Sequence, residues 1–197
     1  MTVQPTDPFE IFDDWLSKAT KMLGQEAASA VNLATVSGEG KPSSRMVLLK
    51  EHSRKGFVFY TNLGSRKACD LSDNPHAALC FYWGVLGLQI RIEGSVEAVT
   101  SEEADAYFAS RPLASRIGAW ASKQSSPLET KQQLLRRVAR YTASYSLKDL
   151  GRPPFWSGFR IVPTRFEFWT AKEFRLHERA VFDLQDNCSW QRYLVYP

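Results

Sequence analysis

Pairs of cationic residues mark the ends of two β-prone runs in the first third of the chain. Arg45 and Lys50 flank the run Met-Val-Leu-Leu, and Arg66-Lys67 closes the segment 56–67. Burying a cation costs free energy unless an anion meets it, so these residues predict binding of anionic groups. A strand advances about 3.3 Å per residue, which separates Arg45 from Lys50 by about 16 Å, too far to hold one phosphate. The spacing therefore predicts one elongated ligand or two adjacent ligands.

The segment 45–67 is predicted to form an antiparallel hairpin with anion-binding residues at both ends. Residues five apart point to opposite faces of a regular strand. Arg45 and Lys50 can therefore line one cleft only if their strand twists, bulges or lies at the rim of a barrel.

Three donors stand on alternate positions near the C-terminus, namely Arg175, His177 and Arg179. In an extended strand, all three side chains face the same way. A neutral imidazole beside guanidinium groups suits an anionic or electron-rich aromatic ligand. Trp169 either packs beside a planar ring of that ligand or belongs to the core. Further phosphate-compatible donors with aromatic neighbours are Tyr60-Thr61, Tyr107 with Arg111 and Ser115, and Gln124-Ser125.

The composition is that of a globular chain of 197 residues with 44% hydrophobic residues and a net charge of +4. No composition shift marks a linker, so residues 1–197 are predicted to form a single domain in which residues 1–6 are flexible. Signal-peptide and membrane-spanning patterns are absent, which predicts a soluble cytoplasmic protein with no membrane partner. The three cysteines lack metal-type spacing, and the scattered basic residues disfavour nucleic acid as a partner.

The elements expected to position these residues are mainly β. Period-two alternation is clearest over 88–99, and Asp7-Pro8 gives the start signal of an amphipathic helix. The architecture predicted is an all-antiparallel β-barrel with helices inserted between two groups of strands. Strands are expected at 30–36, 45–50, from 56 onward, 77–83, 88–99, 159–162, 165–169, 179–183 and 190–195, and helices at 8–23, 68–74, 100–110, 114–122 and 128–147.

Several familiar catalytic arrangements are not found in the sequence. There is no supported Ser-His-Asp set, no pair of catalytic carboxylates and no Gly-rich P-loop. With phosphate-binding residues but few acids or bases, the protein needs a cofactor for difficult chemistry.

Six motifs resemble those of the pyridoxamine 5'-phosphate oxidase family, and they span nearly the whole chain from Asp7. They occur in the family order and at family-like spacing. The motifs are Arg45-Met-Val-Leu-Leu-Lys50, Phe59-Tyr-Thr-Asn-Leu-Gly-Ser-Arg-Lys67, Tyr107-Phe-Ala-Ser-Arg111-Pro, Ile117-Gly-Ala-Trp-Ala-Ser-Lys-Gln-Ser-Ser126, Phe155-Trp-Ser-Gly-Phe159 and Arg175-Leu-His177-Glu-Arg179.

The resemblance implies an FMN-binding split β-barrel of Greek-key type and a homodimer with FMN at the subunit interface. It also implies oxidation of pyridoxamine or pyridoxine 5'-phosphate to pyridoxal 5'-phosphate, by hydride transfer from the C4' carbon to flavin N5. Dioxygen then reoxidises the flavin and yields hydrogen peroxide.

By the same resemblance, two groups of residues hold the ligands. Arg175 and His177 are the catalytic residues that cover the pyridine ring, and Lys50, Tyr107, Arg111 and Ser115 bind the substrate phosphate. The cofactor residues, some of them supplied by the other subunit, are Arg45, Met46, Val47, Leu48, Lys50, Tyr60, Thr61, Arg66, Lys67, Gln89, Gln124, Ser125, Trp169 and Arg179.

The chain departs from the family pattern at several places. We expect the family's segment before the first helix, with its Arg and Tyr, to be missing or removed. Leu88 stands where an Arg is common, Thr170-Ala171 replaces Gln-Gly, Glu178 replaces Asp, and the C-terminus reads Leu194-Val-Tyr-Pro197. These changes affect turnover, lid closure and substrate preference more than the class of ligand. Two alternatives stay open: another FMN-dependent reductase on the same barrel, and a non-catalytic pyridoxal 5'-phosphate binding protein.

Overall fold

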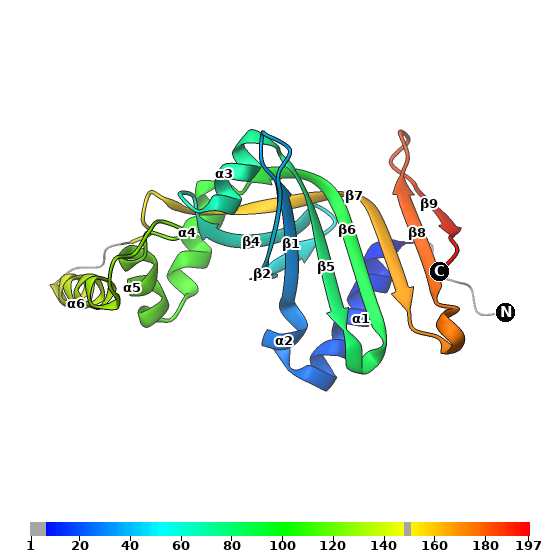
Figure 1. Ribbon diagram of the computed structural model, residues 1–197, viewed down its shortest axis with the longest axis horizontal. Coiled ribbons are helices and arrows are strands. Elements are labelled where there is room, and N and C mark those ends of the chain that lie inside the picture. The colour runs from blue at the N-terminus through cyan, green and yellow to red at the C-terminus, as the bar shows by residue number, and fades with distance from the viewer. Residues whose placement is uncertain (1–6, 148–150) are drawn as a thin grey trace.

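The structure, a computed structural model, describes residues 7–147 and 151–197, so the predicted flexibility of residues 1–6 lies outside the described residues. Within this part of the chain, one nine-stranded antiparallel sheet curls over a helix (Figure 1). The strands are β1 (Ala30–Val36), β2 (Pro42–Leu48), β3 (Glu51–Ser53), β4 (Gly56–Asn62), β5 (His76–Trp83), β6 (Leu88–Ala98), β7 (Trp156–Thr170), β8 (Glu178–Leu184) and β9 (Trp190–Leu194). The helices are α1 (Pro8–Leu23), α2 (Gln25–Ser29), α3 (Arg66–Asp73), α4 (Ser101–Ser110), α5 (Leu113–Ala121) and α6 (Lys131–Leu147), with 3-10 turns η1 (Gly84–Leu86) and η2 (Glu173–Arg175).

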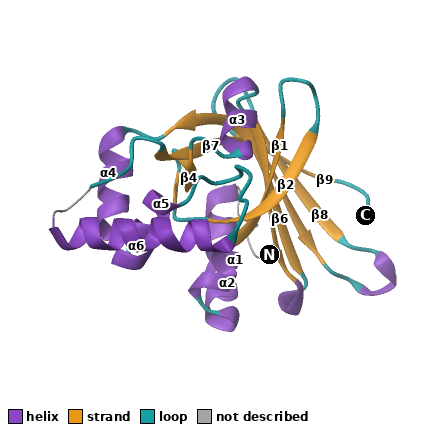
Figure 2. Ribbon diagram, turned by 60° about the vertical axis from the view of Figure 1, so that its left-hand side comes forward, coloured by secondary structure: helices purple, strands orange, loops and turns teal. Residues whose placement is uncertain are grey.

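The sheet is organised around β7, which is 15 residues long. β6 pairs with one edge of β7 over most of its length, while β4 and β8 pair with successive parts of the other edge. The resulting order is β2-β1-β5-β6-β7-β4-β3, and β8 and β9 extend it from the far end of β7. Helices α4, α5 and α6 gather at one side of this sheet (Figure 2). The sheet with its inserted helices confirms the predicted antiparallel architecture.

The core lies between the curled sheet and α1. Asp7 caps this helix by accepting a hydrogen bond from Phe9 N at 2.9 Å, as its Asp-Pro start predicts. The Phe12 ring is fully buried and makes edge contacts with Phe57 of β4 and Phe81 of β5 at centroid distances of 4.9 and 5.4 Å. The amphipathic first helix therefore closes the open side of the sheet and fixes its curvature.

A β-bulge in β7, with Thr164 as its extra residue, supplies part of that curvature. Its register with β6 shifts between Glu93 and Gly94, opposite Pro163. A Cβ at Gly94 would lie 2.0 Å from the Val162 carbonyl oxygen, so no other residue fits. Proline is tolerated at such a bulge because the ladder is already interrupted there. For this reason, the strands predicted at 159–162 and 165–169 are in fact one strand.

The predicted hairpin of residues 45–67 is wrong in its pairing. β2, which carries Arg45, pairs along its whole length with β1, and within the segment 45–67 it is the short β3 that pairs with β4. The β1–β2 turn at 37–41 is closed by a hydrogen bond from Ser37 N to Lys41 O at 3.0 Å. Propensity identified the strands but not their partners. The helix predicted at 128–147 begins at Lys131.

Candidate functional site

A cavity of about 1020 Å³ is lined by parts of β2, β4, α3, α4 and α5. It brings together most of the residues that the sequence singled out, although they come from five separate elements. The predicted residues that line it are Arg45, Met46, Val47, Leu48, Lys50, Tyr60, Thr61, Arg66, Lys67, Tyr107, Arg111, Ser115, Gln124 and Ser125.

Arg45 and Lys50 both reach the cavity because their strand does not continue between them. β2 ends at Leu48, and Lys50 N then donates a hydrogen bond to Val58 O of β4 at 2.9 Å. The chain therefore leaves the β1 edge and turns towards β4 within two residues. This bend meets the geometric condition stated above for two residues five apart in sequence.

The Arg45 guanidinium is held in place by the protein itself. Nη1 donates to Thr35 Oγ1 at 2.7 Å, Nη2 donates to Ser43 Oγ at 2.8 Å, and Nη2 lies 3.6 Å from the Asp70 carboxylate. Asp70 is buried in α3 and also accepts a hydrogen bond from Thr35 Oγ1 at 2.6 Å. Burial lowers the pKa of Arg45, and the charge of Asp70 opposes that shift. The carboxylate that this half-buried cation requires is therefore Asp70.

Lys67, at the start of α3, is a buried cation with a different environment. Its side chain is 8% exposed, and Nζ donates to Thr61 Oγ1 at 3.2 Å and to Ser65 Oγ at 3.4 Å. Among residues 7–147 and 151–197, no carboxylate forms an ion pair with it. Burial, followed by the charge of Arg45, lowers the pKa of Lys67. A positive charge at a helix N-terminus with only hydroxyl partners favours an anionic ligand.

Three aromatic rings form a stack at the α4 side of the cavity. The Tyr60 ring lies 4.0 Å from Tyr107 and 5.4 Å from Trp156, with interplanar angles of 10° and 4°. The Arg111 guanidinium carbon lies 4.8 Å from the Trp156 ring centre. Burial and the hydrogen bond from Tyr60 to Glu51 raise the pKa of the Tyr60 phenol, which therefore stays protonated at neutral pH.

The loop after α5 is fastened to the end of β4. Gln124 Oε1 accepts from Thr61 Oγ1 at 3.1 Å, and Asn62 Nδ2 donates to Ser122 O at 3.3 Å. Ser125 has a positive φ of 69°, which is uncommon for a residue other than glycine. These contacts hold Gln124 and Ser125 at the cavity, where the sequence predicted them.

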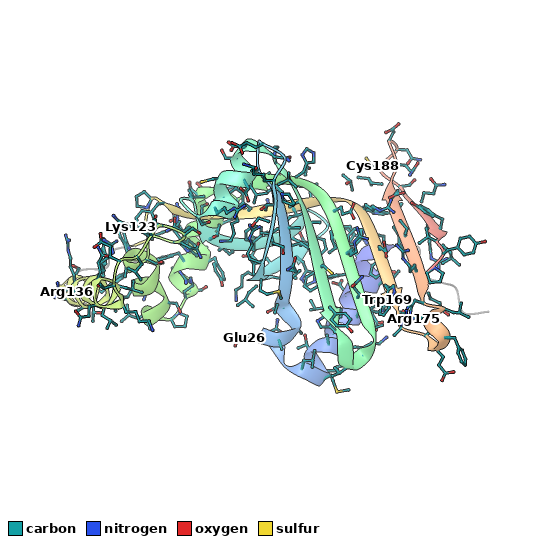
Figure 3. The ribbon with its side chains drawn as sticks, in the orientation of Figure 1. Glu26, Lys123, Arg136, Trp169, Arg175 and Cys188 are labelled. Carbon is teal, nitrogen blue, oxygen red and sulfur yellow. The ribbon has the colours of Figure 1, made fainter. Side chains whose placement is uncertain are left out.

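Five predicted site residues do not line this cavity: Gln89, Trp169, Arg175, His177 and Arg179. Gln89, Trp169 and Arg179 are cross-strand neighbours on β6, β7 and β8, so their side chains share one face of the sheet. Figure 3 shows Trp169 and Arg175 near one end of the long axis and Lys123, next to cavity residue Gln124, towards the other. We call these five residues the sheet-end cluster.

Arg175, His177 and Arg179 do not form the extended strand that their alternation predicted. Arg175 lies in η2, where φ is 57° at Phe174 and 62° at Arg175, and β8 begins only at Glu178. The His177 ring nevertheless lies 4.6 Å from Trp169, and its Nδ1 accepts a hydrogen bond from Lys172 N at 3.2 Å. A tight turn therefore brings the histidine against the tryptophan.

Arg179 is anchored by a carboxylate that the sequence did not single out. Glu167 of β7 is 4% exposed and accepts hydrogen bonds from Arg179 Nε at 2.9 Å and Nη2 at 3.0 Å, and from Arg91 at 3.2 Å. Arg179 Nη1 also donates to the Tyr196 carbonyl at 2.9 Å. Burial alone raises the pKa of Glu167, but Arg179 and Arg91 lower it overall. The C-terminal segment is thereby tied to the sheet-end cluster.

Three further residues complete the surroundings of the site and were missed: Asp70, Trp156 and Glu167. Asp70 and Glu167 are single carboxylates within ordinary helix and strand patterns. Their importance becomes visible only in the structure, where each lies beside an arginine from another element. Trp156 stands in a quoted motif, but no signal in the sequence linked it to Arg111. In the described part of the chain, no group of three or more His, Cys, Asp or Glu side chains could hold a metal ion. No helix there is long and apolar enough to cross a bilayer.

Comparison with solved structures identifies the fold. PhzG from Burkholderia lata 383, in complex with tetrahydrophenazine-1-carboxylic acid, superposes with a TM-score of 0.90 at 29% identity, covering 98% of this chain and 94% of that one. A pyridoxamine 5'-phosphate oxidase-related, FMN binding protein from Nostoc punctiforme PCC 73102 has a TM-score of 0.76 at 16% identity, covering 98% and 100%. The predicted split-barrel fold is thus confirmed.

Sequence comparison assigns the family. The model described as pyridoxamine 5'-phosphate oxidase matches residues 21–145, and the pyridoxine 5'-phosphate oxidase C-terminal dimerisation region matches residues 156–197. Pyridoxine/pyridoxamine 5'-phosphate oxidase from Zymomonas mobilis is 49% identical over 191 residues, covering 97% of this chain and 98% of the relative. The enzyme of the same name from Maricaulis maris is 53% identical over 192 residues, covering 97% and 86%. The chain therefore belongs to the pyridoxamine 5'-phosphate oxidase family and carries the C-terminal dimerisation region of that family.

Proposed function

We propose that this protein is an FMN-dependent oxidase that converts pyridoxamine and pyridoxine 5'-phosphate to pyridoxal 5'-phosphate. The substrate loses two electrons and two protons, one hydrogen from the C4' carbon and one from the oxygen or nitrogen attached to it, and these reduce dioxygen to hydrogen peroxide. The alcohol gives the aldehyde directly, whereas the amine also takes up water and releases ammonia. The observation that carries the proposal is that one cavity holds two separate groups of cations.

The first group suits the phosphate of FMN. Lys67 is buried with hydroxyl partners only, Arg66 begins the same helix, and Arg45 is fixed by Asp70 beside them. A buried ammonium without a carboxylate is costly unless an anion binds there, so the donor set fits the group. In this proposal Arg45, Arg66 and Lys67 hold the cofactor phosphate, with Thr61, Gln124 and Ser125 alongside.

The second group suits the substrate phosphate. Tyr107, Arg111 and Ser115 come from α4, α5 and the link between them, and Tyr60 of β4 stacks on Tyr107. Thr61, the next residue of β4, accepts a hydrogen bond from Lys67 Nζ, so the first and second groups of cations lie side by side. Lys50, exposed after β2, serves the substrate phosphate and the ring edge of the cofactor. Two neighbouring phosphate sites are what FMN and a phosphorylated substrate would need if they bind in contact with one another.

The sheet-end cluster completes the site from a second subunit in this proposal. Its residues do not line the cavity of their own chain, and all of them except Gln89 lie in the region that matches the family's dimerisation model. The same open face of the sheet carries the exposed residues Tyr82 and Met46. Met46 also lines the cavity. A two-fold dimer would bring each cluster to the partner's cavity, because an isologous interface presents every residue twice. The FMN then lies at the subunit interface.

Bound FMN supplies the two-electron chemistry that amino acid side chains lack. The protein residues hold and orient the substrate: Arg111 and Lys50 bind its phosphate, while Arg175 and His177 cover the pyridine ring and its substituents. Holding the reacting carbon close to its acceptor accounts for a large part of catalysis in such sites. Neither a paired acid and base nor a metal is part of this scheme.

A spectrum and an oxygen electrode test the proposal. Purified protein reconstituted with FMN should show the flavin absorption bands and should consume dioxygen when given pyridoxamine or pyridoxine 5'-phosphate, with pyridoxal 5'-phosphate as product. Protein that binds no flavin would contradict the proposal. Unphosphorylated pyridoxamine is the control, and it should turn over far more slowly because the second cation group has no anion to hold.

Two other functions give different results in the same experiment. A different FMN-dependent enzyme on this barrel, favoured by the likeness to PhzG, would bind flavin and leave both B6 phosphates unoxidised. A non-catalytic pyridoxal 5'-phosphate binding protein would bind that compound tightly with little or no flavin. Retention of the whole cavity-lining set argues for the oxidase. The predicted cytoplasmic location and the single domain remain predictions.

A further inference from the structure

Arg111 has an environment unlike that of the other cations near the site. Its Nη1 atom is buried and has no hydrogen-bond partner in the part of the chain that the structure describes. Burial lowers the pKa of Arg111, which reflects the cost of an uncompensated charge at that place. The guanidinium carbon instead lies 4.8 Å from the ring centre of Trp156 and 5.5 Å from that of Phe108. Arg111 is therefore held by aromatic faces.

Carboxylates perform this task for two other arginines of the site, Arg45 and Arg179. Arg45 lies beside Asp70, and Arg179 makes two hydrogen bonds to Glu167. A carboxylate fixes a guanidinium but also neutralises it, which weakens its attraction for a phosphate dianion. An aromatic ring fixes the guanidinium plane through its quadrupole and leaves the full charge available. The partner of Arg111 is thus of the type that preserves its charge.

Trp156 is itself rigidly placed. It is 6% exposed, and it pairs with Asn62 at the end of β4. Its carbonyl accepts a hydrogen bond from Arg152 Nη1 at 2.7 Å, and its indole stacks parallel to Tyr60 at 5.4 Å. The ring also lies 6.2 Å from Tyr107, at an interplanar angle of 7°. One indole therefore contacts Arg111 and both tyrosines at this end of the cavity.

We propose that Trp156 is a positioning residue that sets the preference of the site for phosphorylated substrates by holding Arg111 without neutralising it. The inference rests on the proposed function, because it takes the anion at Arg111 to be the substrate phosphate. Trp156 touches no reacting atom in this proposal. Its effect is on the geometry and the charge of Arg111, and it should appear in the affinity for the phosphate group.

The test compares Trp156→Phe and Trp156→Leu with the wild type in FMN-loaded protein. The affinity for pyridoxal 5'-phosphate, which as the product is not turned over, is measured by calorimetry alongside that for pyridoxal. We expect Trp156→Leu to weaken pyridoxal 5'-phosphate about tenfold and Trp156→Phe by less, because a benzene ring is the poorer cation–π partner. Pyridoxal affinity and FMN content should stay within about twofold of wild type, as neither depends on the charge of Arg111. In turnover, KM for the phosphorylated substrate should rise while kcat changes little.

Trp120→Leu is the matched control. Trp120 packs on Tyr141 and Phe155 outside the cavity lining, so this change removes an indole nearby without touching Arg111. Unchanged affinity for pyridoxal 5'-phosphate in the Trp156 variants would overturn the proposal. Equal losses for pyridoxal and its phosphate, or the same loss in Trp120→Leu, would do so too, because each indicates a general packing role.

Two further arms keep the outcome decisive. If Trp156→Leu does not fold, Trp156→Phe retains the stack and decides the question. On an Arg111→Gln background, Trp156→Phe should cost no further affinity, since the residue through which it acts is gone. If the wild-type protein takes up no FMN, the proposed function fails, and the affinity of flavin-free protein for inorganic phosphate then tests Trp156 on its own.

Discussion

Lys67, which is buried, and Arg45, which is half-buried, show that two cations at one site need not have the same role. Arg45 has the carboxylate of Asp70 beside it, so its charge is compensated within the protein. Lys67 has hydroxyl partners, and burial lowers its pKa. Its positive charge therefore raises the free energy of the protein when no ligand is bound. A bound phosphate would offset this unfavourable free energy. Substitution of Lys67 should therefore affect cofactor binding more directly than substitution of Arg45.

The first prediction is that Lys67→Ala weakens FMN binding by roughly tenfold to a hundredfold, the range for losing a hydrogen bond to a charged group. Quenching of FMN fluorescence on titration with the flavin-free protein measures the dissociation constant. Lys21→Ala, an exposed lysine on α1, is the control and should bind FMN as the wild type does. Equal affinities for the two variants would remove Lys67 from the phosphate site.

Arg175 gives the second prediction. Arg175→Leu should leave flavin content near normal and lower turnover about a hundredfold, because a substrate ring left unheld is misplaced relative to its acceptor. Flavin absorbance and oxygen uptake measure the two quantities separately. Phe174→Leu is matched, since it changes an exposed neighbour at the same positive-φ turn. Loss of flavin from Arg175→Leu would reassign this residue to cofactor binding.

At this scale, the sequence identified residues that line the cavity better than the residues that hold them in place. Arg66, Lys67, Arg111 and Gln124 line the cavity as expected, because charged or amide side chains beside aromatic ones are visible in a linear pattern. Trp156 could not be identified in this way. Its relation to Arg111 arises only when the first residue of β7 meets the end of α4.

Among the elements, strand identity was predictable and strand pairing was not. The alternation over 88–99 predicted the bounds of β6 to within one residue, because one face of this strand is buried in the core. The β2 strand was assigned to the wrong partner, since its own residues say nothing about which neighbour lies alongside. The extended strand predicted at Arg175 was wrong because the chain makes a local turn there. Phe174 and Arg175 both have positive φ, and nothing in these two residue types predicts that conformation.

The third prediction concerns the β6–β7–β8 ladder and pH. The folded pKa of Glu167 is lowered, so its ion pairs stabilise the protein fully above the ordinary pKa of 4.5 and progressively less as pH falls through that value. Glu167→Gln should lower the free energy of unfolding at pH 7 by about 1–3 kcal/mol, the range for hydrogen bonds to charged groups, because the two arginines left behind are partly exposed to water. Urea unfolding at pH 7 and at pH 4 measures both effects.

Glu93→Gln is the matched variant for this prediction. Glu93 pairs with Arg91 at 2.6 Å but is more exposed than Glu167, so its removal should cost at most about 1 kcal/mol. The difference in stability between wild type and Glu167→Gln should narrow on acidification. A gap that stays constant between the two pH values would show that the carboxylate charge of Glu167 is not what stabilises the ladder.

For the whole molecule, the sequence indicated the fold and, through the resemblance, a second subunit, but not which predicted site residues lie apart within one chain. The resemblance placed all the ligand-binding residues in one functional set, with some from another subunit. The structure shows which members lie apart within one chain: the cavity residues lie on β2, β4, α3 to α5 and the loops beside them, and the sheet-end cluster lies on β6 to β8. No periodicity reports such a separation, because it depends on the curl of the completed sheet.

If the sheet-end cluster completes the partner's cavity, as we propose, two defective chains can repair one another. Arg111→Leu damages only the cavity half, and Arg175→Leu only the sheet-end half. In a mixed dimer of the two, one site carries both defects and the other is intact. Unfolding and refolding an equal mixture should therefore restore about one quarter of wild-type activity, from two preparations that are each nearly inactive. If mixtures stay as inactive as their components, each chain supplies both halves of its own site.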